Sequence, residues 1–246
     1  MATIISLLSQ KGGVGKSTLT MMLLNVLYHV YGLRVLLLDA DFPQYSILKK
    51  RQRELQIIER KPRLSKKYNS LYQDREPYPI IQCKLVDCPA TIEKYKNDFD
   101  LIFVDITGSI NQPNIVEFFK CINYYFIPIF QDDLSIYSSM ELYSILINHV
   151  KPISDAFKGC KILFNRIPPK NHVQTIREQL SAIDMMEQEV GAYSLYERIG
   201  RSTIFPMPSN KKETQKFYVF VEHFLQTIQS PVISSTAVEK ASVITG

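Results

Sequence analysis

The residues best suited to chemistry stand near the start of the chain, in the run Gln10-Lys11-Gly12-Gly13-Val14-Gly15-Lys16-Ser17-Thr18. An apolar stretch at 4–8 precedes this run, and an apolar periodic segment at 19–30 follows it. A strand, a glycine turn and a helix in that order cradle phosphate, because closely spaced glycines let successive backbone N–H groups converge on an anion. The helix N-terminus adds unpaired amides and a positive dipole end. The run therefore predicts a nucleotide site.

The side chains of this run have distinct predicted roles. Lys16 is expected to reach the β- and γ-phosphates, the Ser17 hydroxyl to ligate Mg²⁺, and Thr18 to touch the α-phosphate. The backbone around these phosphates comes from Gly12, Gly13, Val14 and Gly15. A glycine-rich turn without a ligand is the alternative, but the Gly-Lys-Ser ending makes the nucleotide interpretation much more specific.

The first lysine distinguishes this run from the usual phosphate-binding loop. The usual pattern has a glycine five residues before Gly15, where this chain has Gln10 followed by Lys11. Lys11 followed by Gly-Gly-Val-Gly-Lys-Ser resembles the deviant Walker A box of the ParA/MinD family of ATPases. The resemblance implies that Lys11 acts in trans on the partner's ATP, so that the chain forms a homodimer on ATP. An ordinary solvated lysine is the alternative for Lys11.

A second motif, Asp39-Ala40-Asp41-Phe42-Pro43-Gln44, follows the apolar strand expected at 35–38. Carboxylates at the C-terminal end of such a strand lie at the edge where these sheets bind ligands. The motif resembles the Asp-x-Asp-Pro-Gln box of the same ATPases, with one additional residue. Carried over, Asp41 positions or activates the attacking water, and Asp39 supports the Mg²⁺ shell. Turn aspartates that cap a helix beginning near Tyr45 are the alternative.

A third apolar strand, over 100–104, ends at Asp105 and is followed by Thr107-Gly108. Any buried strand can end in Asp, so this signal is weak alone. It becomes specific when it occurs together with the glycine-rich run and the Asp39-x-Asp41 motif. It is a Walker B arrangement, in which Asp105 holds a water ligand of Mg²⁺ and Gly108 senses the γ-phosphate through its backbone.

Base recognition is expected from two later segments. The strand at 160–164 ends in Asn165 and Arg166, which resemble the adenine-recognition strand of the ParA/MinD group. The Asn165 carboxamide offers the donors and the acceptor that an adenine edge requires, and a turn asparagine is the alternative. The run Thr203-Ile204-Phe205-Pro206 is similar to the loop that lines the base pocket in relatives, so Pro206 joins the nucleotide-binding residues.

The net charge of +5 is unevenly distributed. Between Leu48 and Lys67 the local balance is +7, which leaves −2 for the remaining residues. Such a segment predicts a surface for nucleic-acid phosphates. A solvated helix face is the alternative. The DNA-binding candidates are Lys49, Lys50, Arg51 and Arg53.

The length of 246 residues, with 46% hydrophobic residues, predicts one α/β domain over 1–229 and a poorly ordered tail over 230–246. The fold expected is a doubly wound, mostly parallel sheet of about seven strands, which the resemblance makes a P-loop NTPase of the SIMIBI type. Within it, a basic helix is predicted over 46–60, an irregular segment over 62–79 and a long helix over 134–150.

The cellular setting follows from segments that the sequence lacks. It has no signal peptide and no apolar run of about 18 residues, so a cytoplasmic protein is expected. The cysteines show no CxxC spacing, so buried reduced thiols are expected at Cys83, Cys88, Cys121 and Cys160.

Taken with the resemblance, these residues imply a Mg²⁺-ATP hydrolysing switch of the ParA type, carried by a plasmid or mobile element, that binds non-specific DNA. Its hydrolysis is expected to be slow and stimulated by a ParB-like partner protein. The first alternative is a MinD-like positioning ATPase, although the tail lacks a basic amphipathic membrane helix. The second is an ATP-dependent biosynthetic ligase or amidase-coupled enzyme, which needs a small-molecule pocket beside the γ-phosphate.

Overall fold

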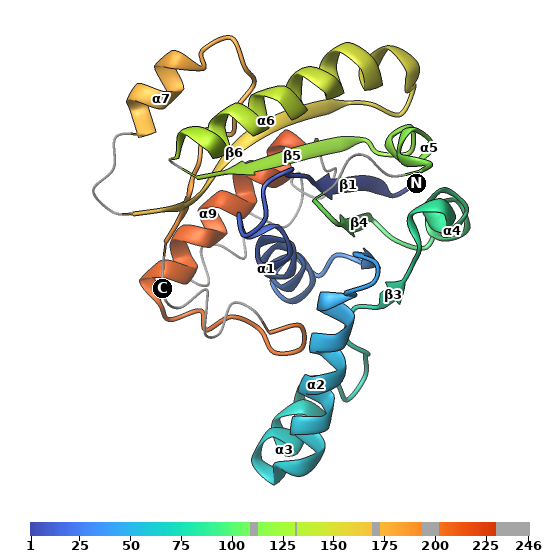
Figure 1. The fold of residues 1–246 in the computed structure, drawn as a ribbon. Helices are drawn as coiled ribbons and strands as arrows, with labels where there is room; N and C mark the ends of the chain where they lie inside the picture. The colour runs from blue at the N-terminus through green and yellow to red at the C-terminus, as the bar shows by residue number, and fades with distance from the viewer. Residues whose placement is uncertain (109–112, 131, 169–172, 193–201, 230–246) are drawn as a thin grey trace.

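The computed structural model describes residues 1–108, 113–130, 132–168, 173–192 and 202–229. One seven-stranded sheet runs through it in the order β3-β2-β4-β1-β5-β6-β7 (Figure 1). Every strand pairing among the described residues is parallel. The strands are β1 Thr3–Leu7, β2 Val35–Ala40, β3 Ile80–Gln82, β4 Leu101–Ile106, β5 Tyr124–Ile129, β6 Gly159–Ile167 and β7 Val190–Gly191.

The helices alternate with these strands along the chain. They are α1 Lys16–His29, α2 Ser46–Arg60, α3 Pro62–Leu71, α4 Cys88–Tyr95, α5 Ile115–Phe119, α6 Asp133–Ile145, α7 Val173–Gln179 and α9 Lys212–Thr227. Strand, helix and parallel strand in succession make a doubly wound α/β fold, so the predicted fold class is confirmed. The predicted tail over 230–246 lies outside the described residues.

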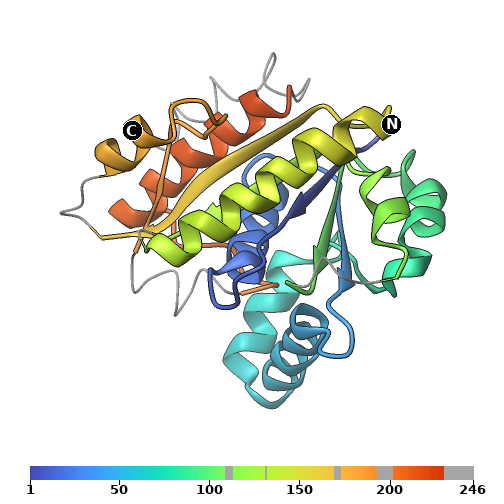
Figure 2. The same ribbon diagram turned by 45° about the horizontal axis from the view of Figure 1, so that its top comes forward.

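Alternate residues of the central strands face two separate hydrophobic cores, as the period of a strand requires. On one face, Val35 and Leu37 pack with the apolar sides of α1 and α9. On the other face, Leu36 and Leu38 pack with α4, α5 and α6 (Figures 1 and 2). Because both faces are covered, the strands are apolar at consecutive positions, as buried parallel strands are.

The strand order reverses at β1, which lies between β4 and β5. Ligands bind such sheets outside the carboxyl ends of the strands at this switch point. The glycine-rich run follows β1 directly, Asp105 lies in the C-terminal part of β4, and Asp39 is the register partner of Asp105 on β2. The topology therefore brings the first three predicted motifs to one edge.

The prediction of an irregular segment over 62–79 was wrong for its first half, which forms α3. Pro62 stands in the first turn of α3, where its missing N–H is tolerated. Leu64, Tyr68 and Leu71 follow at helical spacing and pack against Ile58 of α2 in a small separate core. The high density of charge in this segment concealed the apolar stripe. Both views show the α2–α3 hairpin projecting from the sheet (Figures 1 and 2).

The predicted helix over 134–150 changes character before its end. It is α-helical to Ile145 and continues as a π-helical turn over Leu146–Val150. Pro152 follows in a short 3₁₀ turn, Lys151–Ile153. Proline lacks the N–H that an α-helix needs there and its ring crowds the preceding turn, so the regular helix ends early.

Candidate nucleotide and magnesium site

The loop after β1 has a backbone that only glycine adopts readily. Gly15 has a φ of +88°, and a Cβ placed on it would lie 2.8 Å from Asn165 Nδ2. Gly13 has a φ of +80°. These conformations disfavour side chains with a Cβ, and they curl the chain into a loop at the N-terminus of α1. The backbone therefore forms the tight loop that the glycine spacing predicts, and its binding of phosphate stays a prediction.

Ser17 and Asp105 form the polar centre of this edge. Ser17 Oγ donates a hydrogen bond of 2.8 Å to Asp105 Oδ2. Asp105 is buried, and its Oδ1 has no hydrogen-bond partner among the residues that the structure describes. Burial raises the pKa of Asp105 to about 7, with the Ser17 hydrogen bond opposing this shift and the charge of Asp39 adding to it. A buried carboxylate oxygen without a partner is a place for a ligand.

These groups fit Mg²⁺. Within the described ranges no three His, Cys, Asp or Glu side chains group closely enough to hold a metal ion. Mg²⁺ at a phosphate site does not need such a cage, because it takes one or two protein ligands and completes its shell with water and phosphate oxygens. The Ser17 hydroxyl and the open Asp105 Oδ1 supply that small set of oxygens.

Lys16 and Gly108 approach each other across the same edge. A Cβ on Gly108 would lie 2.9 Å from the Ser9 carbonyl oxygen and 3.7 Å from Lys16 Nζ. The absence of a side chain at Gly108 thus lets its backbone pack against the glycine-rich loop. Burial lowers the pKa of Lys16, while the carboxylates of Asp105 and Asp41 act to raise it. Lys16 therefore lies among the predicted acidic groups.

The two aspartates of the Asp39-x-Asp41 motif have different surroundings. Asp39 is fully buried, and its Oδ2 accepts hydrogen bonds from the amides of Ile47 and Leu48, at 3.0 and 2.8 Å. Asp39 thus caps the first turn of α2, which is the role that the alternative interpretation of the motif gave to its aspartates. Burial raises the pKa of Asp39. Asp41 is only partly buried, and its charge acts on the pKa of both Lys16 and Asp105.

Lys11 forms an ion pair within its own chain. Its Nζ contacts Oδ1 of Asp132, a residue that motif reasoning missed. The same Asp132 oxygen accepts a hydrogen bond of 2.9 Å from the amide of Ser135, which caps α6. The hydrogen bond from Lys11 lowers the pKa of Asp132. An Asp directly before an amphipathic helix is a capping signal, but nothing in the sequence links it to Lys11.

Asn165 and Arg166 contact the loop itself. Asn165 Nδ2 donates to the Val14 carbonyl at 2.7 Å, and Arg166 donates to the Gly13 carbonyl at 3.2 Å. Asn165 is buried at the end of β6, and its Oδ1 accepts from the Arg166 amide at 3.0 Å. Their side chains therefore adjoin the cradle, and the carboxamide keeps one N–H and one lone pair beyond these bonds.

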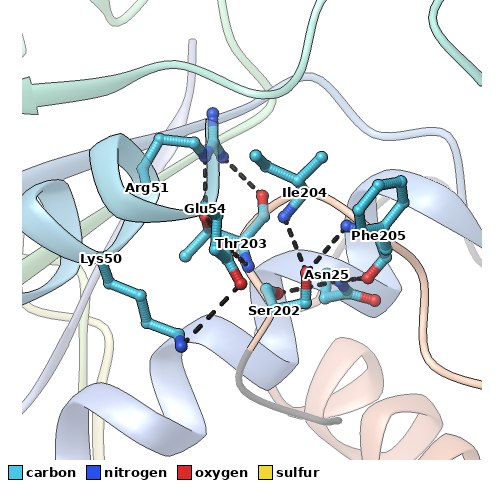
Figure 3. Close-up of polar contacts among 8 residues, drawn as sticks. All are labelled: Asn25, Lys50, Arg51, Glu54, Ser202, Thr203, Ile204 and Phe205. Carbon is cyan, nitrogen blue, oxygen red and sulfur yellow. Dashed lines mark hydrogen bonds and ion pairs between the residues drawn. The ribbon is translucent and has the colours of Figure 1, made fainter. Parts of the chain in front are cut away.

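Side chains of two helices, α1 and α2, hydrogen-bond the segment around Pro206 (Figure 3). From α1, Asn25 Nδ2 donates to the carbonyls of Ser202 and Phe205, and Asn25 Oδ1 accepts from the Met207 amide. From α2, Arg51 donates to the side chain and the carbonyl of Thr203, at 2.8 and 2.6 Å. Glu54 accepts from the Thr203 amide at 2.9 Å.

Arg51 has therefore no exposed charge to offer a nucleic acid. The residue is 8% exposed, and its guanidinium also donates to the Tyr78 carbonyl and lies over the Tyr78 ring. The expectation that placed it among the DNA-binding residues is corrected, because it faces the interior of the hairpin base. Lys50 is half-buried and lies 3.8 Å from Glu54, whereas Lys49 and Arg53 are exposed.

A family model described as the CobQ/CobB/MinD/ParA nucleotide binding domain matches residues 5–203. The chain belongs to this family. The matched range contains the glycine-rich loop, the Asp39-x-Asp41 motif, Asp105 and Asn165, which the fold gathers at one edge. The resemblance to ParA/MinD ATPases is thereby confirmed.

Solved structures share the fold of the CobQ/CobB/MinD/ParA domain. A ParA family ATPase from Chlorobium tepidum TLS is 14% identical with a TM-score of 0.64, over 91% of this chain and 99% of that one. A candidate plasmid partition protein from Borrelia burgdorferi B31, bound to AMPPNP, is 18% identical with a TM-score of 0.63, over 92% and 98%. The MinD cell division protein of Aquifex aeolicus is 18% identical with a TM-score of 0.61, over 92% and 98%.

No curated protein sequence matches the chain. In the described part of the chain, none of the helices combines the length and the apolar character that crossing a membrane requires.

Proposed function

We propose that this chain is a Mg²⁺-dependent ATPase switch of the cytoplasm, which dimerises on ATP and positions or segregates DNA as ParA-like proteins of plasmids and mobile elements do. In this proposal Lys16 and the loop amides bind the phosphates, and Asp41 positions the attacking water. Mg²⁺, held by Ser17 and Asp105 with support from Asp39, neutralises charge on the γ-phosphoryl group. Hydrolysis is slow until a ParB-like partner stimulates it.

The observation that carries the ATPase proposal is the hydrogen bond between Ser17 and Asp105. It joins the glycine-rich loop to the end of β4 and leaves Asp105 Oδ1 buried without a partner among the described residues. Lys16 lies beside Asp105. This edge of the sheet therefore combines a cation suited to phosphate with a carboxylate oxygen suited to a metal-bound water.

The test is binding of ATP, measured by calorimetry with and without Mg²⁺. Lys16→Ala is expected to abolish nucleotide binding. Asp105→Asn is expected to retain nucleotide binding and to lose its dependence on Mg²⁺. The control is Lys158→Ala, which removes an exposed lysine next to the start of β6, near the amino ends of the strands. Undiminished affinity in Lys16→Ala would refute the site.

The catalytic proposal has its own variant. Asp41→Ala is expected to bind ATP and to accumulate as an ATP-bound dimer, because the carboxylate that positions the water is gone. Turnover and sedimentation measured together check this. Normal turnover in the variant would show that the catalytic carboxylate lies elsewhere.

The DNA proposal is supported by the outer face of α2. Lys49, Arg53 and Arg60 are exposed and recur at i, i+4 and i+11, which places them in one row on the helix. Ile47, Arg51 and Ile58 occupy the opposite, buried face. The row spans about 16 Å at 1.5 Å per residue, and a DNA duplex carries a charge every ~1.7 Å of its axis. A straight row of cations on a projecting hairpin suits such a polyanion.

Duplex DNA binding is measured with ATP, with ADP and without nucleotide, over a salt series. We expect the chain to bind DNA in the ATP state. In a plot of the logarithm of the binding constant against the logarithm of the salt concentration, the slope should be about −0.9 for each phosphate contacted. Lys49→Glu with Arg53→Glu is expected to weaken binding without changing nucleotide affinity. Lys151→Glu with Lys158→Glu serves as the matched double charge reversal away from α2. If both reversals act alike, the α2 row is not the DNA surface.

A further inference from the structure

Two buried thiols lie against each other where β3 leaves the sheet. Cys83 directly follows β3, Cys88 is the first residue of α4, and a short turn, Leu85–Asp87, joins them. Cys88 Sγ lies 3.5 Å from Cys83 Sγ. The two residues are 5% and 0% exposed. Their spacing in the chain is not a CxxC motif, so the turn and the start of α4 bring the sulfurs together.

The two thiols share a hydrogen-bond acceptor, the Lys84 carbonyl. Each S–H has the Lys84 carbonyl within 3.3 to 3.4 Å, and the Thr91 hydroxyl lies 3.6 Å from Cys83 Sγ. These are weak hydrogen bonds, because thiols are weak donors. The Cys88 S–H donates toward Cys83 Sγ, and a donated hydrogen bond favours the thiolate at the accepting sulfur, so Cys83 is the sulfur that reacts first.

We propose that Cys83 and Cys88 form a reversible dithiol–disulfide site that peroxide oxidises. The Cys83 thiolate attacks one oxygen of hydrogen peroxide, the O–O bond breaks, and Cys83 sulfenic acid forms with loss of hydroxide. The Cys88 sulfur then attacks the Cys83 sulfur, the S–O bond breaks, and water leaves with the Cys88 proton. One peroxide thus becomes two waters while two thiols lose two electrons. The sulfurs must approach by about 1.5 Å to reach disulfide length.

The cysteine pair directly contacts the strand that carries the Asp39-x-Asp41 motif. The Cys83 amide donates to the Asp39 carbonyl at 3.0 Å, and the preceding Gln82 is the register partner of Asp39. Closing the disulfide draws the Cys83 and Cys88 side chains together next to this hydrogen bond. We therefore infer that oxidation disturbs the end of β2 and lowers ATP turnover severalfold. This second step rests on the proposed ATPase function, whereas disulfide formation does not.

The experiment treats the full chain with hydrogen peroxide and reads intact mass and non-reducing peptide maps. The expected product has lost two hydrogens, contains a Cys83–Cys88 bridge and returns to the dithiol with dithiothreitol. In Cys88→Ser, Cys83 is expected to stop at the sulfenic acid and to be captured by dimedone. The Cys160→Ser variant lacks another buried thiol and is expected to form the Cys83–Cys88 disulfide as the native chain does.

Half-buried Cys121 is the internal reference for oxidant access. Oxidation of Cys121 without a Cys83–Cys88 bridge would overturn the proposal. A bridge that leaves turnover unchanged would overturn the coupling alone. No turnover even in the reduced chain would refute the ATPase proposal, and the peptide map would still decide on the disulfide.

Discussion

Lys11 Nζ is ion-paired with Asp132, the residue that caps α6, in the same chain. A lysine held in this way cannot also reach a partner's nucleotide. If Lys11 acts in trans, as the ParA/MinD resemblance implies, the pair must break when two chains meet. In that case Asp132, which caps α6, also competes with the dimer contact for Lys11.

Asp132→Ser is expected to strengthen ATP-dependent dimerisation, because serine keeps an oxygen for the Ser135 amide and removes the charge that holds Lys11. Asp132→Ala loses both and is expected to lower the free energy of unfolding by about 1 kcal/mol. Sedimentation with ATP measures the first effect and denaturant unfolding the second. Weaker dimerisation in Asp132→Ser would show that Asp132 supports the dimer.

Asp105→Asn is expected to stabilise the chain when Mg²⁺ and nucleotide are withheld. The folded pKa of Asp105 is about 7, above the ordinary value. A raised pKa means that the stabilising contribution is complete below about pH 4 and is lost as the pH rises through about 7. The amide cannot ionise, so the variant should exceed the native chain by about 1–3 kcal/mol at high pH.

Thermal unfolding in the presence of a chelator, from acid to mildly alkaline pH, measures this difference. The advantage of Asp105→Asn should shrink below neutral pH. An equal difference at every pH would mean that the shift of Asp105 does not govern stability.

Arg51→Ala is expected to destabilise the fold by about 3 kcal/mol, because it leaves the buried carbonyls of Tyr78 and Thr203 without their charged donor. The matched control is Arg53→Ala, an exposed arginine on the same helix, which should stay within roughly 0.5 kcal/mol of the native chain. Urea unfolding measures both. Equal effects of the two variants would contradict the structural role of Arg51.

His29 should make stability sensitive to mild acid. Arg75 lies 3.4 Å from its Nδ1 and can only donate, so Nε2 carries the proton that faces the Ile204 carbonyl at 3.0 Å. Burial, aided by the charges of Arg75 and Arg51, lowers the pKa of His29 to about 4. With the folded pKa depressed, its stabilising contribution is present above about pH 6.5 and is lost as the pH falls toward 4.

His29→Gln keeps an N–H for Ile204 and cannot gain a proton. The loss of stability between about pH 6.5 and 4 should therefore be smaller in the variant, by at most roughly 3 kcal/mol. Unfolding measured at several pH values checks this. Identical dependence of the unfolding free energy on pH in the two chains would show that His29 does not cause the acid sensitivity.

The strands and the glycine-rich loop follow from local sequence patterns. Apolar runs such as 35–38 are typical of strands buried on both faces, and the glycines at 13 and 15 take conformations that few other residues adopt. Local signals of this kind do not depend on the rest of the chain. They also put Asp105 near the carboxyl end of a buried strand, at the edge where such sheets bind ligands.

The partners of the polar side chains, in contrast, follow from the packing of distant segments. Lys11 and Asp132 are 121 residues apart, and Arg51 and Thr203 are 152 apart, so no periodicity connects them. Arg51 looks like its basic neighbours in the sequence, and only the packing of α2 against residues 202–207 turns it inward. Asp39 likewise became a helix cap because the first turn of α2 folds back onto it. Side-chain partners depend on long-range packing, which local sequence patterns do not encode.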